Sequence, residues 1–131
     1  MELLLDTHIW VWAEGEPQKL SRYVQRQLSN PSNELYLSPV SIWEAGLMHR
    51  RGRLRGRGSF AEWLKQALSF TPVREAPFSF AVGDEAAAIR LPESDPGDVF
   101  LAATARVYNL TLVTADPQLL GCAWLKTLSN E

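Results

Sequence analysis

Residues 95–105 read Asp-Pro-Gly-Asp-Val-Phe-Leu-Ala-Ala-Thr-Ala, and residues 110–116 read Leu-Thr-Leu-Val-Thr-Ala-Asp. The first segment predicts the start of a helix, because Asp95 can act as its N-cap and Pro96 suits the first helical position. The second segment is a short apolar run that predicts a buried strand. Together they indicate a chain in which helices alternate with buried strands.

Two acids, Asp98 and Asp116, lie at the ends of these predicted elements. Side chains at element ends leave the core, so these carboxylates are candidates for chemistry. A purely structural alternative is that Asp98 completes a capping box with Asp95, and that Asp116 caps a short helix starting at Pro117. The choice between the two depends on whether other acids reach the same place.

The composition of the 131 residues is that of an ordinary globular protein, with 46% hydrophobic and 21% charged residues. This length fits one domain, residues 1–131, that can bury a core. A net charge of −2 argues against a strongly cationic nucleic-acid binder but is compatible with a local basic patch. The single cysteine, Cys122, cannot form an internal disulfide, so we expect a cytoplasmic protein. We expect no membrane segment, because no apolar run reaches roughly 18 residues, and no signal peptide at residues 1–5.

Strands and helices alternate along the rest of the chain. We expect strands at residues 2–5, 34–37, 70–73, 111–114 and 123–125, and helices at 7–13, from Ser21, from Ser38, from Ser59, at 77–91, at 96–109 and from Pro117. Ser38 and Pro39 favour a helix start that places Glu44 inside the helix. A start at Ser41, in a capping box with Glu44, is the alternative. This order predicts a three-layer α/β/α fold with a mostly parallel sheet.

Four acids are expected at one edge of this sheet, because ligands of open parallel sheets bind beyond the carboxyl ends of the strands. They are Asp6 after the first strand, Glu44 on the helix after the second, Asp98 on the helix before residues 111–114, and Asp116 after that strand. If the strands of Asp6 and Asp116 are neighbours, the carboxylates converge and need a cation or a proton. Oxygen ligands without Cys or His suit Mg²⁺ or Mn²⁺. Such ions commonly serve phosphodiester cleavage.

Four motifs taken together resemble the PIN-domain nucleases, and most closely the VapC-type toxins of bacterial toxin–antitoxin pairs. They are Asp6-Thr7-His8, Ser38-Pro39-Val40-Ser41-Ile42-Trp43-Glu44, Asp95-Pro96-Gly97-Asp98 with Ala102-Ala103-Thr104-Ala105, and Val113-Thr114-Ala115-Asp116. The resemblance covers essentially the whole chain. It implies a Mg²⁺-dependent endoribonuclease, often a homodimer, that cleaves RNA and is inhibited by a small VapB-like antitoxin. It assigns metal binding and catalysis to Asp6, Glu44, Asp98 and Asp116, with Asp95 and Thr114 in support.

The basic residues depart from the commonest pattern of the family. Many relatives carry a basic residue where this chain has Val99, and a lysine near Met48. Here the basic charge is concentrated instead in five arginines, which are Arg50, Arg51, Arg53, Arg55 and Arg57. Glycines separate them and no acid lies among them, so they predict a basic loop. We expect this loop to guide RNA phosphates toward the acids; a loop that binds an acidic antitoxin tail, or a solvated loop without a partner, is the alternative.

Two rival functions belong to other classes. A non-catalytic RNA- or protein-binding module could share the fold, but the presence of all four acids argues against it. A phosphotransfer enzyme of the haloacid-dehalogenase type needs a second acid two residues after the first, where this chain has His8. We expect His8 to pack or cap near the strand end, with a role at the metal as the alternative. We expect the tryptophans in the core or at an interface, with stacking on RNA bases as the alternative that singles out none of them; they are Trp10, Trp12, Trp43, Trp63 and Trp124.

Overall fold

Helices cover both faces of a central sheet. The computed structural model describes residues 1–54, 56, 58–92 and 95–131. Its elements are β1 (Glu2–Leu5), α1 (Thr7–Gly15), η1 (Pro17–Lys19), α2 (Arg22–Ser29), β2 (Glu34–Leu37), α3 (Pro39–Arg50), α4 (Phe60–Phe70), β3 (Arg74–Glu75), α5 (Phe80–Ala88), α6 (Pro96–Val107), β4 (Thr111–Thr114), α7 (Pro117–Leu120) and β5 (Thr127–Ser129). None of the described helices is long and apolar enough to cross a membrane.

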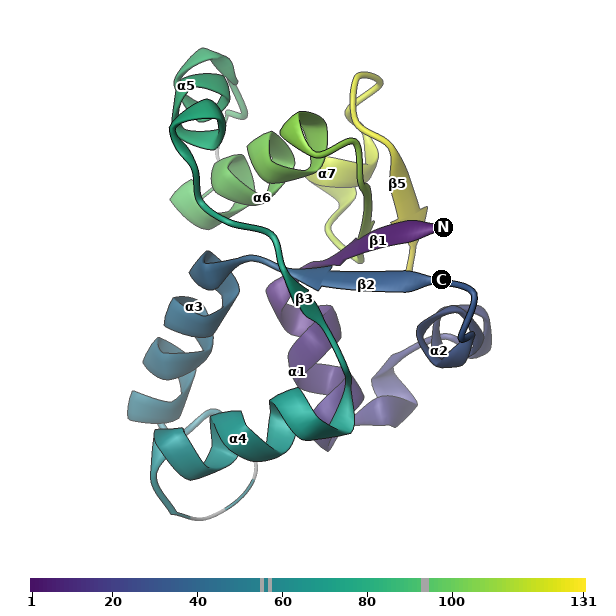
Figure 1. Ribbon diagram of the computed structural model, residues 1–131, viewed down its shortest axis with the longest axis vertical. Helices are drawn as coiled ribbons and strands as arrows, with labels where there is room; N and C mark the ends of the chain where they lie inside the picture. Colours follow the sequence, from purple (N-terminus) through teal and green to yellow (C-terminus); the bar gives the residue numbers. More distant parts are fainter. Residues whose placement is uncertain (55, 57, 93–94) are drawn as a thin grey trace.

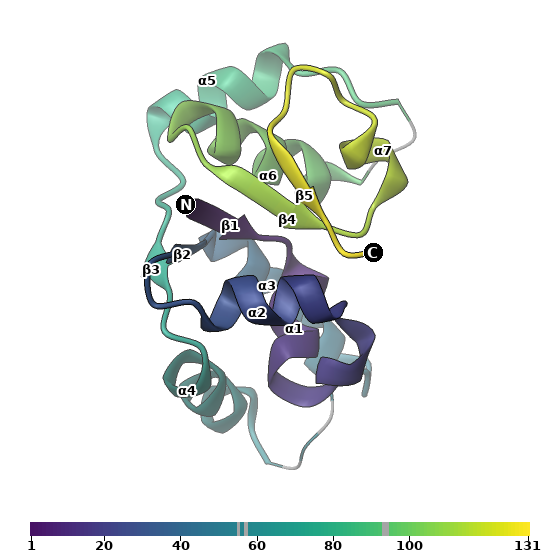
Figure 2. The same cartoon turned by 90° about the vertical axis from the view of Figure 1, so that its right-hand side faces the viewer.

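The sheet has the strand order β3-β2-β1-β4-β5, and each of its pairings is parallel. Helices α1, α2, α3 and α4 lie on one face, and α5, α6 and α7 lie on the other (Figure 1, Figure 2). The predicted three-layer α/β fold is confirmed, and the sheet is parallel throughout the described strands.

The central strand β1 is buried on both faces. Leu3 and Leu5 pack with Trp10 in the core cluster under α1, whereas Leu4 packs with Leu101 of α6 in the cluster on the other face. All three strand leucines are 0% exposed. A continuous apolar run is what a parallel strand between two helical layers requires.

Most of the predicted helix starts are correct, because their caps form as the sequence implies. The hydroxyl of Ser21 accepts from the backbone N–H of Val24, and Ser59 and Glu62 form the full capping box. Ser38 caps α3, so the alternative start at Ser41 is wrong. Ser41 is instead buried inside α3, where it contacts a hydroxyl of α1.

Two predicted strands are wrong. Helix α4 continues to Phe70, and the neighbouring edge strand β3 comes only after Pro72, which lacks the N–H that a strand ladder needs. Residues 123–125 form no strand, because the backbone turns there and Leu125 donates its N–H to Cys122. The apolar Leu125 is buried beside the sheet, and the last strand is β5. The helix expected at 77–91 is shorter, since Ser79 caps α5.

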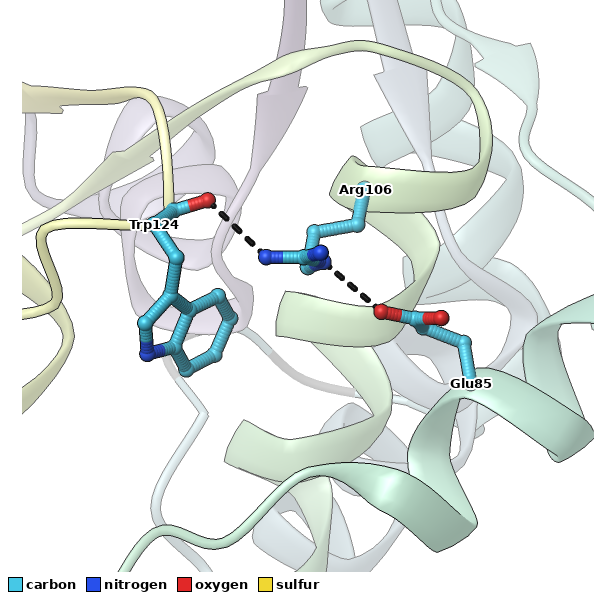
Figure 3. A network of polar contacts seen from close by, with 3 residues as sticks. All are labelled: Glu85, Arg106 and Trp124. Carbon is cyan, nitrogen blue, oxygen red and sulfur yellow. Dashed lines mark hydrogen bonds and ion pairs between the residues drawn. The ribbon is translucent and has the colours of Figure 1, made fainter.

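Arg106 ties three segments together at the far end of α6 (Figure 3). Its Nε donates to Oε1 of Glu85 on α5 at 2.7 Å, and its Nη1 donates to the carbonyl oxygen of Trp124 at 3.2 Å. The guanidinium carbon lies 5.1 Å from the centroid of the Trp124 ring. Because both charged side chains are substantially exposed, we expect the ion pair to contribute only about 0–1 kcal/mol.

Candidate active site

The predicted acids meet where the order of the strands reverses. Strands β1 and β4 are direct neighbours, with Leu5 paired to Val113. The backbone N–H of Asp6 extends this pairing by donating to the carbonyl of Val113 at 3.0 Å. β2 lies on the other side of β1. The strands that follow β1 in the sequence are therefore placed first on one side of it and then on the other, which makes this the switch point of the sheet. Ligands of open α/β sheets bind at such switch points.

A hollow of about 360 Å³ opens at this edge of the sheet. All four predicted metal ligands line it, together with Asp95. The five acids are Asp6, Glu44, Asp95, Asp98 and Asp116. They come from the end of β1, from α3, from the first turn of α6 and from the start of α7. The fold therefore brings together side chains that are far apart in the sequence; Asp6 and Asp116 are separated by 110 positions.

Thr114 holds the first of these acids in place. Its side chain is fully buried, and its Oγ1 donates a 2.6 Å hydrogen bond to Oδ2 of Asp6. The same oxygen accepts the backbone N–H of Asp116 at 3.0 Å. One hydroxyl thus connects the acid that follows β1 to the acid that follows β4. This contact gives Thr114, predicted as a supporting residue, a specific positioning role.

A chain of hydroxyls positions Glu44. Oγ1 of Thr7 lies 2.6 Å from Oε1 of Glu44 and 2.8 Å from Oγ of Ser41. Thr7 has a single hydroxyl proton, and an ionised carboxylate can only accept. When Glu44 is ionised, Thr7 therefore donates to Glu44, and Ser41 donates to Thr7. Helix α1 and helix α3 are joined at the acid site by this relay.

Gly97 allows α6 to approach the Glu44 carboxylate. A β-carbon at position 97 would lie 2.9 Å from Cδ of Glu44 and 3.1 Å from Oδ1 of Asp95. Real β-carbons essentially never come that close, so any other residue would displace the carboxylate. Sequence reasoning missed this role. The available signal was a glycine, which lowers helix stability, inside the first turn of a helix and between two acids.

Burial, together with neighbouring carboxylates, raises the pKa values of Asp6, Glu44 and Asp98. Burial, followed by the charges of Asp95, Asp116 and Asp6, raises the pKa of Asp98 to about 7. The pKa of Glu44 is raised by burial and by Asp95 and Asp6, and the hydrogen bond from Thr7 partly offsets this. Burial also raises the pKa of Asp6, against the hydrogen bond from Thr114. A positive charge in the hollow would remove this repulsion.

The donor chemistry of the hollow fits a hard divalent cation. It offers carboxylate oxygens and a threonine hydroxyl, which suit Mg²⁺ or Mn²⁺ better than a soft metal. Within the described residues, no three His, Cys, Asp or Glu side chains are already grouped as ligands of one ion.

Comparison with known proteins identifies the family. The PIN domain family matches residues 3–124. The chain belongs to the PIN-domain family. This PIN domain is 31% identical over 120 residues to Ribonuclease VapC22 of Mycobacterium tuberculosis, covering 89% of this chain and 88% of the relative.

Solved structures share the fold of this PIN domain. VapBC2 from Rickettsia felis, bound to a DNA fragment from its promoter, matches with a TM-score of 0.77 and 18% identity, covering 100% of both chains. FitAcB from Neisseria gonorrhoeae matches with a TM-score of 0.69 and 23% identity, covering 98% of this chain and 97% of that one. At these identities the likeness concerns the fold.

Three of the five predicted basic residues are described in the structure, and none of these three lines the acidic hollow of this PIN domain. Arg50 ends α3, and Arg51 and Arg53 follow it, all three exposed. Arg53 lines a second, adjacent hollow. Arg55 and Arg57 lie outside the described residues.

Trp12 was not predicted as a site residue, and His8 was given a role at the metal only as an alternative, yet both line the acidic hollow. His8 is exposed, and its ring lies 5.7 Å from that of Trp12. Of the other tryptophans, Trp10 and Trp63 are in the core as expected, whereas Trp43 and Trp124 are 63% and 41% exposed.

Proposed function

We propose that this PIN domain is a metal-dependent endoribonuclease and the toxin of a type II toxin–antitoxin pair. The observation that carries the proposal is the convergence of Asp6, Glu44, Asp98 and Asp116 around one hollow at the switch point of the sheet. The likeness to Ribonuclease VapC22 supports RNA as the substrate class. The single free cysteine fits the reducing cytoplasm, where RNA is abundant.

The four carboxylates would hold one or more divalent ions, Mg²⁺ or Mn²⁺. Such an ion neutralises charge on the attacking and leaving oxygens of a phosphodiester. Thr114 keeps Asp6 aimed into the hollow, and Thr7 does the same for Glu44. With a pKa of about 7 in the absence of a cation, Asp98 is about half protonated near neutral pH, and a bound cation would favour its ionised form.

Chelation and a charge-neutral variant test this function. Protein treated with EDTA should not cleave RNA, and added Mg²⁺ or Mn²⁺ should restore cleavage. Asp98→Asn should lower cleavage on the order of 100-fold while the fold persists, because it removes a negative charge that would hold the divalent ion. The matched control is Asp84→Asn, since Asp84 is an exposed aspartate on α5 that does not line the hollow. RNA binding without metal-dependent cleavage would favour the non-catalytic module instead.

The antitoxin is expected to cover apolar surface on the helical layer of α2 and α4. A groove of about 510 Å³ lies there, lined by Leu20, Leu28, Leu35 and Phe70 among others. Phe70 is 67% exposed. A toxin–antitoxin complex from Klebsiella pneumoniae that shares this fold, with a TM-score of 0.68, supports a protein partner of this kind. Phe70→Ser should weaken capture of the antitoxin encoded beside this chain, whereas growth arrest without the antitoxin should persist.

A homodimer is the expected form of the toxin. Trp43 on α3 is 63% exposed and Phe80 on α5 is 99% exposed, and both helices lie on the left-hand side of Figure 1. Large exposed aromatic side chains of this kind are enriched at protein interfaces. Phe80→Ser should lower the molar mass measured by light scattering toward that of a monomer. Phe70→Ser should not, so each variant serves as the control for the other.

A further inference from the structure

A second hollow continues from the acid site along α1. It encloses about 260 Å³, and its lining includes His8, Trp12, Lys19 and Arg53. His8 and Trp12 also line the acidic hollow. The two spaces therefore share a wall, and a ligand bound at the acids lies next to the second hollow. Its size is slightly below the roughly 300 Å³ at which pockets for drug-sized ligands begin, which suits a single flat ring system.

The shared wall is aromatic. His8 and Trp12 are four residues apart on α1, so they lie one above the other on the same face of the helix. Their ring centroids are 5.7 Å apart. Trp12 packs partly against the core, while His8 is exposed. The two ring planes are inclined at 55° to each other, so this wall suits a single base that stacks on one ring at a time.

Cations flank the same wall. Nζ of Lys19 lies 5.5 Å from the centroid of the Trp12 ring, while Lys19 also pairs with Glu16 at 2.8 Å. Arg53 belongs to the same hollow and is exposed. The acid site repels the phosphates on either side of a reacting phosphodiester, so an RNA strand needs cations close by. An aromatic platform flanked by cations is the arrangement that binds single-stranded nucleic acid.

We propose that His8 and Trp12 form a stacking platform for an RNA base next to the phosphodiester held at the acid site, with Lys19 and Arg53 contacting the flanking phosphate. This inference rests on the proposed ribonuclease function and assigns it a substrate subsite. An antitoxin side chain is the other conceivable occupant. RNA is favoured because the hollow adjoins the acidic hollow and combines aromatic rings with two cations, Lys19 and Arg53, beside one acid, Glu16.

A base-deletion experiment tests the platform. The probe is a fluorescein-labelled ten-nucleotide RNA that the wild type cleaves, made also as a series with one abasic residue at each position. Binding is measured in EDTA, so that the RNA stays intact. One abasic position should weaken binding to the wild type roughly tenfold, which is within the range for loss of one stacked base. In Trp12→Leu the intact RNA should bind roughly tenfold more weakly, and that abasic position should have no further effect.

Two control variants complete the design. Trp12→Phe keeps an aromatic ring and should retain most of the binding. Trp124→Leu removes a partly exposed tryptophan that also lies under a cation, but at the other end of α6 (Figure 3), and it should bind like the wild type. Thermal unfolding of each variant shows whether the fold is kept. If Trp12→Leu does not fold, His8→Ala takes its place in the abasic series, and Trp12→Phe serves as the control that keeps an aromatic ring.

The outcomes separate this inference from the proposed function. If the wild type cleaves RNA but Trp12→Leu binds intact and abasic RNA as the wild type does, the platform is overturned while the ribonuclease stands. The platform is also overturned if Trp12→Leu weakens antitoxin binding only. If the wild type cleaves no RNA with any divalent cation, the proposed function fails and the platform fails with it.

Discussion

Thr114 donates a 2.6 Å hydrogen bond to Asp6 and accepts the backbone N–H of Asp116, so one buried hydroxyl connects the two acids at the centre of the site. Valine has the same shape but cannot donate. We expect Thr114→Val to lower the free energy of unfolding by about 1–3 kcal/mol, because it leaves a buried carboxyl group without its donor. Cleavage should fall as well. Thr111→Val at the start of the same strand is the control, since Thr111 does not line the hollow.

Denaturant unfolding and a cleavage assay check this expectation. Equal stability and equal activity of Thr114→Val and Thr111→Val would show that the hydroxyl at 114 positions nothing.

Gly97 is expected to be required for activity rather than for folding. Alanine normally stabilises a helix relative to glycine by up to about 1 kcal/mol. At position 97 its β-carbon would displace the carboxylate of Glu44, whereas at Gly83 on α5 it would meet only the ring of Phe78 at 3.9 Å. Gly83→Ala should therefore raise the melting temperature and keep cleavage. Gly97→Ala should lose cleavage with no gain in stability, and full activity of that variant would contradict the close approach.

Stability without metal should depend on pH through Asp98. Its pKa is 3.8 as a free carboxyl group and about 7 in the folded chain, so the folded state binds more protons between these values. The free energy of unfolding therefore falls as pH rises from about 4 to 7. Above pH 7 it has lost the full contribution of Asp98 and no longer changes through this group. Asp98→Asn removes the titrating group and should be more stable than the wild type at pH 8, by about 1–2 kcal/mol after screening by solvent.

The comparison requires urea unfolding of EDTA-treated protein at pH 4.5 and pH 8. The two proteins should differ little at the lower pH, and Asp84→Asn should behave like the wild type at both. A wild type that becomes more stable as pH rises would contradict the repulsion among the acids.

The arginines after α3 are expected to contact RNA phosphates without reading its sequence. Replacing Arg50 and Arg51 with alanine should weaken binding of every single-stranded RNA alike. The slope of log affinity against log salt should shrink by about 0.7 for each lost contact. Arg22 and Arg26, two exposed arginines on α2, provide the matched double variant. Salt titrations in EDTA measure both, and equal slopes would assign the basic segment to the antitoxin or to no partner.

The sequence predicts the acid site well because its signals are local. A cap, a proline or a buried run each acts on neighbouring residues, so the strands at 2–5, 34–37 and 111–114 and the helix starts at Ser38 and Asp95 could be predicted. Parallel strands then bring their ends together. The wrong strands were at the edges, where short apolar segments such as residues 123–125 pack beside a sheet as readily as within it.

The contacts that complete the site could not be predicted, because each depends on the distance between two elements. Gly97 matters only because α3 places Glu44 against α6. Trp12 had no mark that distinguished it from Trp10, which lies two residues away on α1 and is fully buried. Only the packing of α1 on the sheet decides which of the two reaches the hollow. His8, by contrast, was already an alternative site residue from the sequence, because it lies two positions after Asp6.

Asp116 does two things at once, since its carboxylate accepts the backbone N–H of Gln118 at the start of α7 and also lines the acidic hollow. Alanine scanning at this position would merge a helix-initiation defect with a loss of charge. Asparagine is as good an N-cap as aspartate, so Asp116→Asn separates the two effects. An inactive toxin made for complex preparation or crystallisation should therefore carry asparagine at 116, which keeps the docking surfaces of the native fold intact.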